Sequence, residues 1–169
     1  MEFAEVVKTR RSIRKFNSRP VPDEVIRTIL EAAMLAPSAG NQQPWRFIVV
    51  RDRKKLDSVP GYHPYAKMIN QAEVAIVVCG APEGCKWPDF WLQDCSAAIQ
   101  NLLLAARDLG LGSVWTGVYP LEDRVSKTRK LFDIPDNVYP LAIIPLGWPE
   151  AEFKPMERFK EEYVKNNTW

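Results

Sequence analysis

The segment from Asp94 to about Leu109 is the feature that most constrains how this chain can fold. Its side chains are mainly Ala, Leu and Ile, and Asp94 is expected to cap the helix that they form. A helix that is apolar on nearly all sides must be buried on most of them. Because the chain has only 169 residues, this degree of enclosure suggests that a partner subunit covers part of the helix.

The rest of the sequence predicts further helices and strands separated by turn-forming residues. Helices are expected at 3–9, from Asp23 as N-cap to about Leu35, and at roughly 122–132. Strands are expected at 45–51, 74–79, 113–118 and 139–146. Residues 80–93 contain two prolines and two glycines, which predicts a loop or a short helical excursion. This order predicts a single α+β sheet domain over residues 1–169, in which the charged segment 150–169 forms an arm.

The composition is that of an ordinary globular protein, with 46% hydrophobic and 26% charged residues. A formal net charge of only +2 argues against a nucleic-acid binder that depends on a broad basic face. Cys79, Cys85 and Cys95 form no CxxC pair, so a cytoplasmic location is expected rather than a disulfide framework. We expect neither a secretory signal nor a membrane partner.

Several kinds of catalysis lack the residues that they need. His63 is the only histidine, and no local signature joins it to a nucleophile. The sequence contains no HExxH motif or cysteine cluster for a metal, and no GxGxxG or Walker motif for a nucleotide. A bound cofactor is therefore the expected carrier of any reaction.

A basic cluster near the N-terminus, Arg10-Arg11-Ser12-Ile13-Arg14, is the first candidate site. One guanidinium group can bind two oxygens of a phosphate at once, and a serine hydroxyl adds a short hydrogen bond. The cluster is therefore suited to bind a phosphate monoester. If residues 12–16 are extended, Ser12 and Arg14 point to the same side and can converge on one anion. Taken alone, however, such a run of charge is more often solvated surface.

The loop between the second helix and the first strand is the second candidate. Its polar side chains are Ser38, Asn41, Gln42 and Gln43. Hydroxyl and amide groups of this kind match the alternating donors and acceptors along the edge of a flavin ring. The alternative is an ordinary polar loop.

Two further segments could contact the same ligand. Gly117 would let the backbone approach a flat molecule closely, and the Thr116 amide could donate to it. Lys154 and Arg158, four residues apart in the arm, could complete a phosphate site. Alternatively, Gly117 simply ends a strand, and Lys154 and Arg158 are surface charges.

Taken together, four stretches resemble the FMN-dependent nitroreductase family, especially its short single-domain members. They are RRSIRKF (10–16), APSAGNQQPWRFIVV (36–50), WPDFWLQDCSAAIQNLLLAARDLGLGSVWTGVYP (87–120) and IIPLGWPEAEFKPMERFKEEYV (143–164). They occur in the family's order and cover most of the chain. The resemblance implies a central, mostly antiparallel sheet flanked by helices, in a homodimer whose C-terminal arm lies over the partner.

The resemblance also implies roles for particular residues in an FMN site built from both subunits. One subunit would hold the phosphate and ribityl side through Arg10, Arg11, Ser12, Arg14 and Arg158. The other subunit would line the flavin ring with Pro37, Ser38, Ala39 and Asn41. The backbone of Thr116 and Gly117 would lie near the reactive nitrogen of the ring. The role of Lys154 stays open, because its spacing varies among relatives.

The implied reaction is ping-pong: NAD(P)H reduces the flavin and leaves, and a nitroaromatic, quinone or similar acceptor then takes the electrons. One hypothesis is that Trp87, Phe90 and Trp91 cover the open flavin face, and core packing is the alternative. Two other functions stay open. They are a same-fold enzyme for flavin cleavage or reductive dehalogenation, and a flavin-binding module without turnover.

Overall fold

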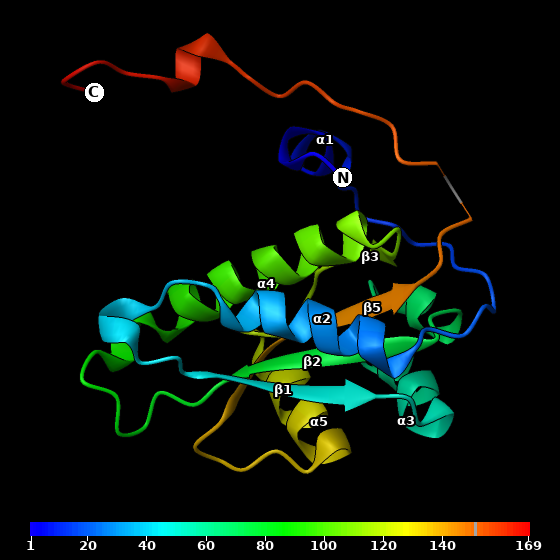
Figure 1. Ribbon diagram of the computed structural model, residues 1–169. Coiled ribbons are helices and arrows are strands. Elements are labelled where there is room, and N and C mark those ends of the chain that lie inside the picture. The colour runs from blue at the N-terminus through cyan, green and yellow to red at the C-terminus, as the bar shows by residue number, and fades with distance from the viewer. Residues whose placement is uncertain (151) are drawn as a thin grey trace.

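A five-stranded sheet forms the centre of the computed structural model, which describes residues 1–150 and 152–169 (Figure 1). The strands are β1 (Trp45–Val50), β2 (Val74–Gly80), β3 (Gly112–Ser113), β4 (Thr116–Gly117) and β5 (Tyr139–Gly147). Their order is β1-β2-β5-β3, and β4 also pairs with β5. All of these pairings are antiparallel. The predicted α+β class with a mostly antiparallel sheet is therefore confirmed.

Helices cover both faces of the sheet. The α-helices are α1 (Phe3–Thr9), which stands apart, and α2 (Asp23–Met34), α3 (Arg53–Ser58), α4 (Trp91–Asp108) and α5 (Glu122–Phe132), which cover the sheet. Short 3-10 helices are η1 (Ala39–Asn41), η2 (Val59–Gly61), η3 (Lys67–Asn70), η4 (Pro88–Phe90) and η5 (Glu161–Tyr163). Helices α2 and α4 lie on one face of the sheet, whereas α3 and α5 lie on the other (Figure 1).

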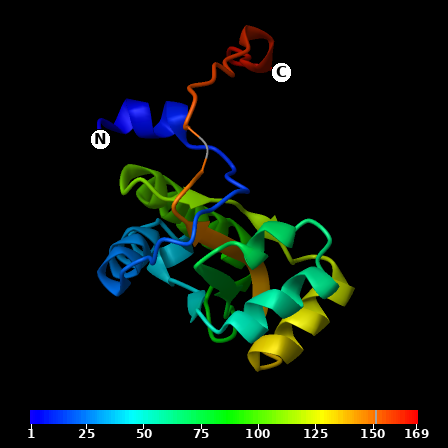
Figure 2. The same cartoon turned by 90° about the vertical axis from the view of Figure 1, so that its right-hand side faces the viewer.

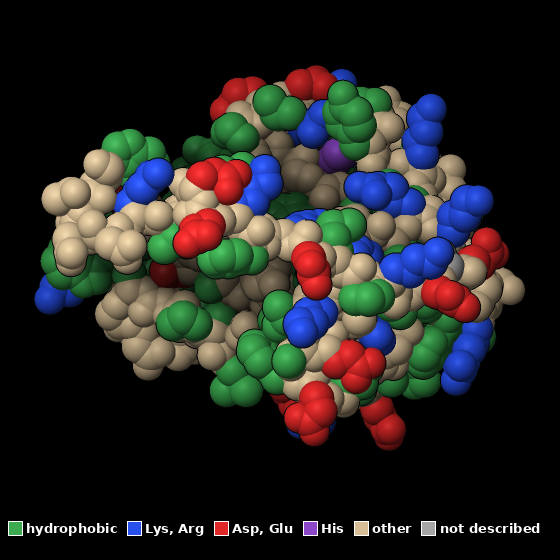
Figure 3. All heavy atoms as spheres, turned by 90° about the horizontal axis from the view of Figure 1, so that it is seen from above, with side chains coloured by type: hydrophobic (Ala, Val, Ile, Leu, Met, Phe, Trp, Pro, Cys, Tyr) green, Lys and Arg blue, Asp and Glu red, His purple; other side chains and the backbone are tan. Residues whose placement is uncertain are grey.

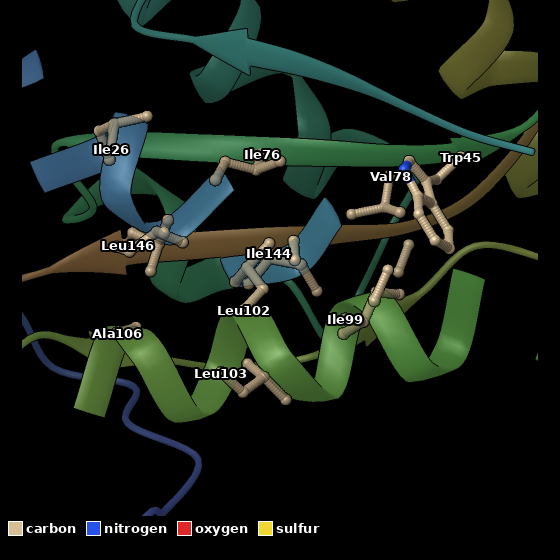
Figure 4. Close-up of a cluster of buried hydrophobic side chains, with 14 of the residues drawn as sticks. Ile26, Trp45, Ile76, Val78, Ile99, Leu102, Leu103, Ala106, Ile144 and Leu146 are labelled. Carbon is tan, nitrogen blue, oxygen red and sulfur yellow. The ribbon is translucent and has the colours of Figure 1, made fainter. Parts of the chain in front are cut away.

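Strand β2 is buried at every position because the sheet is covered on both faces. Ile76 belongs to the cluster beneath α2 and α4, which also contains Ile144 of β5 and Leu102 of α4 (Figure 4). Its neighbour Val77 points the opposite way, into the second cluster with Phe132 of α5. A continuous apolar run in the sequence thus supplies two cores.

Four local predictions need correction. Helix α4 begins at Trp91 instead of Asp94, and the Asp94 side chain is buried instead of capping the helix. The expected strand 113–118 is interrupted, because β3 and β4 are separate short strands. Helix α3 was not predicted, although Asp52 caps it by accepting from the backbone of the next turn. Asp23 is the first residue of α2, not its cap.

Helix α1 and the arm stand away from the sheet (Figures 1 and 2). The Met156 amide donates to the carbonyl of Lys8 (3.3 Å), which ties the arm to α1. Between α1, α2 and α4 lies an open groove of about 380 Å³ with the apolar side chains of Phe3, Leu35 and Leu104. Part of α4 therefore faces this groove and not the core. Within the described residues, no helix is long and apolar enough to cross a membrane.

Candidate functional site

The basic cluster runs along the β3 edge of the sheet. The Ile13 amide donates to the carbonyl of Ser113 (2.9 Å), and Ser12 forms a parallel bridge with the same residue. Ile13 is buried so close to Gly112 that a Cβ at Gly112 would lie 2.7 Å from its side chain. Because side chains alternate along an extended segment, Ser12 and Arg14 point outward, and both are exposed.

A cleft of about 350 Å³ opens beside β4. This volume lies within the range of small-molecule sites. Its lining residues come from four separate parts of the chain: Arg14, His63, Pro64, Tyr65, Lys67, Met68, Val114, Trp115, Thr116, Gly117 and Arg124. Figure 3 shows the purple histidine recessed below the surface with cationic side chains beside it. The cleft thus brings together Arg14, Thr116 and Gly117, which the sequence analysis had selected separately.

Other lining residues were not selected from the sequence. His63, Lys67 and Arg124 belong to no motif, and their nearest sequence neighbours carry no related chemistry. Lys67 begins η3, and Arg124 lies in the first turn of α5. Only the packing of these segments beside β4 brings the three side chains to one cleft.

The cleft is strongly cationic. Arg14, Lys67 and Arg124 line it, and within the described residues none of them forms an ion pair with a carboxylate. Burial is the main cause that lowers the pKa of His63, and the positive charge of Arg124 lowers it further. The His63 side chain is therefore neutral at pH 7. The cleft therefore favours a ligand that carries or develops negative charge.

Gly117 presents its backbone to this cleft. The Val118 amide donates to the carbonyl of Leu141 on β5 (2.9 Å), so the preceding residue, Gly117, turns its polar groups away from β5. Its carbonyl instead accepts from His63 Nε2 (2.8 Å) and from Arg124 Nη1 (3.0 Å). A Cβ at Gly117 would meet no atom within 4 Å, so the glycine borders open space that a flat ligand can enter.

The remaining cations of the cluster lie near the arm. Burial lowers the pKa of Arg10, and the charges of Arg11 and Arg158 lower it further. Arg11 donates to the carbonyls of Lys8 and Arg10, at the end of α1. Arg158 and Lys8 line a cavity of about 660 Å³, and within the described residues no carboxylate pairs with Arg10 or Arg158. Repulsion among these guanidinium groups would be relieved by a bound phosphate. Lys154 is exposed.

The loop 37–44 lies at the opposite edge of the sheet. The Ala39 amide donates to Asp94 Oδ1 (2.9 Å), and Ser38 Oγ accepts from the Gln43 amide (3.0 Å). Asn41 has a left-handed φ of 55° and accepts from the Gln43 side chain. The loop leads into β1, and strands β2 and β5 separate β1 from β4. Three strand spacings of about 4.8 Å put the two edges about 14 Å apart. One chain therefore does not bring Pro37, Ser38, Ala39 and Asn41 to the cleft.

The three aromatic residues of the segment 80–93 behave differently. Trp91 is half-buried and packs against the core, where a Cβ at Gly80 would lie 2.1 Å from its ring and where Tyr119 meets it edge-on. Trp87 and Phe90 are 49% and 43% exposed. Trp87 lies against Gly40, and its amide donates to Gln42 Oε1 (2.9 Å), so it belongs to the loop edge. Of the two alternatives for these aromatic residues, core packing applies to Trp91 only.

The chain offers binding groups but little chemistry of its own. The described residues contain no cluster of three or more potential metal ligands. Cys79 and Cys95 are buried, and burial raises the pKa of each thiol to about 12, which makes them poor nucleophiles at neutral pH. The site is therefore suited to hold a cofactor that does the chemistry.

Comparison with known proteins identifies the family. The nitroreductase family model matches residues 7–83 and 61–148. A protein of Methanothermobacter thermautotrophicus, provisionally named NADH dehydrogenase/NAD(P)H nitroreductase, is 52% identical over 169 residues, which is 100% of this chain and 88% of that protein. A solved structure with the same provisional name from Parabacteroides distasonis has a TM-score of 0.95 and 42% identity, with 100% and 99% of the two chains covered. An FMN-dependent nitroreductase from Clostridium difficile has a TM-score of 0.90 and 30% identity, with 98% and 99% covered. The chain belongs to the nitroreductase family.

Proposed function

We propose that this protein uses FMN to carry two electrons from NAD(P)H to small organic acceptors such as nitroaromatics and quinones. As a nitroreductase, it is an FMN-dependent oxidoreductase. The observation that carries the proposal is the cleft beside β4, where Arg14, Lys67 and Arg124 surround an outward-facing glycine backbone. A cationic cleft with a backbone donor suits a ring that gains negative charge when it is reduced.

The residues fit FMN at both of its ends. Arg10, Arg11, Ser12, Arg14 and Arg158 are proposed to bind the phosphate and ribityl side. The relief of repulsion among Arg10, Arg11 and Arg158 supports this assignment. The backbone of Thr116 and Gly117 is proposed to border the ring. The open space in front of Gly117 supports this second assignment.

The loop residues Pro37, Ser38, Ala39 and Asn41 are proposed to line the flavin of the partner subunit in a homodimer. Two observations support this arrangement. Three strand spacings, about 14 Å, separate β1, into which the loop leads, from β4 at the cleft. Apolar side chains, including Leu104 of α4 and 82%-exposed Leu35, surround an open groove that a second copy can cover. We propose that the arm, residues 150–169, lies over the partner and that the single domain spans 1–169.

Bound FMN would accept a hydride from NAD(P)H and pass the electrons on. In the proposed ping-pong cycle the nicotinamide leaves before the acceptor binds, because one open ring face serves both. The cations of the cleft hold the ring and stabilise negative charge near it. Trp87 and Phe90, exposed on the loop edge, are proposed to cover flat acceptors on the partner's flavin. The three unpaired cysteines are consistent with a proposed cytoplasmic location.

The colour of the purified protein tests the central claim. We expect a yellow protein that bleaches anaerobically with NADH or NADPH and regains its colour when a quinone is added. Steady turnover separates an enzyme from a flavin-binding module. Parallel lines in double-reciprocal plots would support ping-pong, and intersecting lines would refute it. A colourless protein that takes up no FMN would refute the whole proposal.

A further inference from the structure

His63 is a buried histidine to which the proposed electron transfer assigns no role. Its side chain is only 1% exposed. Its backbone is held on both sides, since the His63 amide donates to Val59 (3.0 Å) and the Ala66 amide donates to His63 (2.9 Å). His63 Nε2 lies 2.8 Å from the carbonyl oxygen of Gly117, which is 54 positions away in the sequence. Because a carbonyl only accepts, Nε2 carries the proton of the neutral ring.

Arg124 supplies a second donor to the same oxygen. Its Nη1 lies 3.0 Å from the Gly117 carbonyl. His63 precedes η3 and Arg124 belongs to α5, so two different elements hold one peptide group. Two donors on one carbonyl restrict its rotation more than one donor does.

This brace also restricts the backbone of Gly117, and with it the Gly117 N–H. In an antiparallel strand the N–H and C=O of one residue point to the same side. The Gly117 carbonyl faces away from β5, towards His63 and Arg124, so its N–H is also on that outer side, at the cleft. The N–H belongs to the Thr116–Gly117 peptide and the braced carbonyl to the next peptide, so the brace acts on this donor by restricting the φ and ψ angles of Gly117, which has no side chain to limit them.

We propose that His63 and Arg124 are positioning residues that hold the Gly117 N–H in place for the flavin ring. The inference rests on the proposed function, which puts the Gly117 backbone beside the ring. A rigid donor stabilises developing negative charge more than a mobile one, because it needs no reorganisation. Loss of the brace should therefore weaken FMN binding and lower the reduction potential of bound FMN.

The test compares FMN affinity, visible spectrum and reduction potential among matched variants of the full chain. His63→Leu removes the donor, and His63→Gln keeps an N–H₂ group that can reach the same carbonyl. Tyr62→Phe is the control, because Tyr62 is the neighbouring residue and its hydroxyl accepts from Thr128 and not from the cleft. We expect His63→Leu to raise the Kd for FMN about tenfold, which is the size of one hydrogen bond, and to lower the potential. His63→Gln should restore most of the FMN affinity and most of the reduction potential. Tyr62→Phe should match the wild type.

Specific outcomes would overturn the inference. A folded His63→Leu protein with the wild-type Kd, spectrum and potential would do so, as would a His63→Gln protein that is equally impaired. If His63→Leu does not fold, Arg124→Met removes the second donor from a half-buried position on α5. It should raise the Kd about threefold, and an unchanged Kd would overturn the inference. Failure of the proposed function would be distinguishable, because the wild type itself would then bind no FMN. In that case the inference would also be refuted.

Discussion

The two edges of the sheet carry different groups that we assign to one proposed FMN site. The β4 edge carries the cations Arg14, Lys67 and Arg124 and a braced backbone group. The β1 edge carries a polar loop whose shape is maintained by Asp94 and by turns at Gly40 and Asn41. The first half can attract an anionic ligand, whereas the second can only offer hydrogen bonds. Neither edge alone provides all the groups of the proposed site, which supports the proposal that two chains build it.

The largest expected effect concerns the support of the loop edge. Gly80→Ala would put a methyl group 2.1 Å from the Trp91 ring, at the start of α4. We expect a loss of about 3 kcal/mol in the free energy of unfolding, because the ring is packed between Gly80, Tyr119 and Tyr139 and has little room to move. Urea unfolding measures it. Gly61→Ala is the matched control, since a Cβ there meets nothing within 4 Å. A stable Gly80→Ala protein would show that the loop edge does not depend on this contact.

Arg10→Ala tests the other edge. It removes a charge-assisted contact to the FMN phosphate, so the Kd for FMN should rise about tenfold to hundredfold at unchanged stability. Fluorescence titration of the apoprotein measures the Kd. Arg27→Ala is the control, because Arg27 is an exposed residue paired with Glu31. Wild-type affinity in Arg10→Ala would contradict the phosphate assignment.

Complementation distinguishes one shared site from two independent ones. Arg10→Ala impairs the proposed phosphate contact of one chain and Asn41→Ala impairs the loop of the other, so a mixed dimer contains one intact site. If the two variants are mixed and exchange subunits at random, about a quarter of all sites should be intact. Recovered NAD(P)H oxidation, compared with the unmixed variants, measures this. No recovery despite demonstrated exchange would show that each chain builds its own site.

The anchor of the loop predicts a smaller effect. Asp94→Ala leaves the Ala39 amide without its acceptor, which should cost about 1–2 kcal/mol of stability. Asp94→Asn keeps an oxygen acceptor and should cost less. Thermal unfolding measures both variants. Equal losses in the two variants would mean that the negative charge matters instead of the hydrogen bond.

The smallest expected effect is a pH dependence at the cleft edge. Burial and Arg124 lower the pKa of His63 in the folded protein, whereas the unfolded chain has a histidine pKa of about 6.5. Above that pH this group does not change the stability. Below it the unfolded chain binds the proton first, so the free energy of unfolding falls by at most about 1.4 kcal/mol per pH unit. Urea unfolding at neutral and mildly acidic pH should show this slope in the wild type and less of it in His63→Gln. Identical slopes would contradict a neutral buried His63.

Local patterns were sufficient to predict most helices and strands. The apolar run of β2 and the apolar α4 identified the core, because burial of such residues is favourable in almost any tertiary context. The predicted start of α4 was wrong: the helix begins at Trp91, whose ring packs against Gly80 of β2. The interruption between β3 and β4 was also missed. Both errors depend on contacts between residues that are distant in the sequence.

The sequence by itself determined which groups this protein can use: an arginine cluster for phosphate, a polar loop, and a glycine on a strand. Only the tertiary structure decided which of them meet. The order of the strands separates loop 37–44 from Gly117, and packing brings His63 and Arg124 to the Gly117 carbonyl. The physical reason is that strand order and side-chain contacts between distant segments minimise the free energy of the whole chain. No local pattern encodes them.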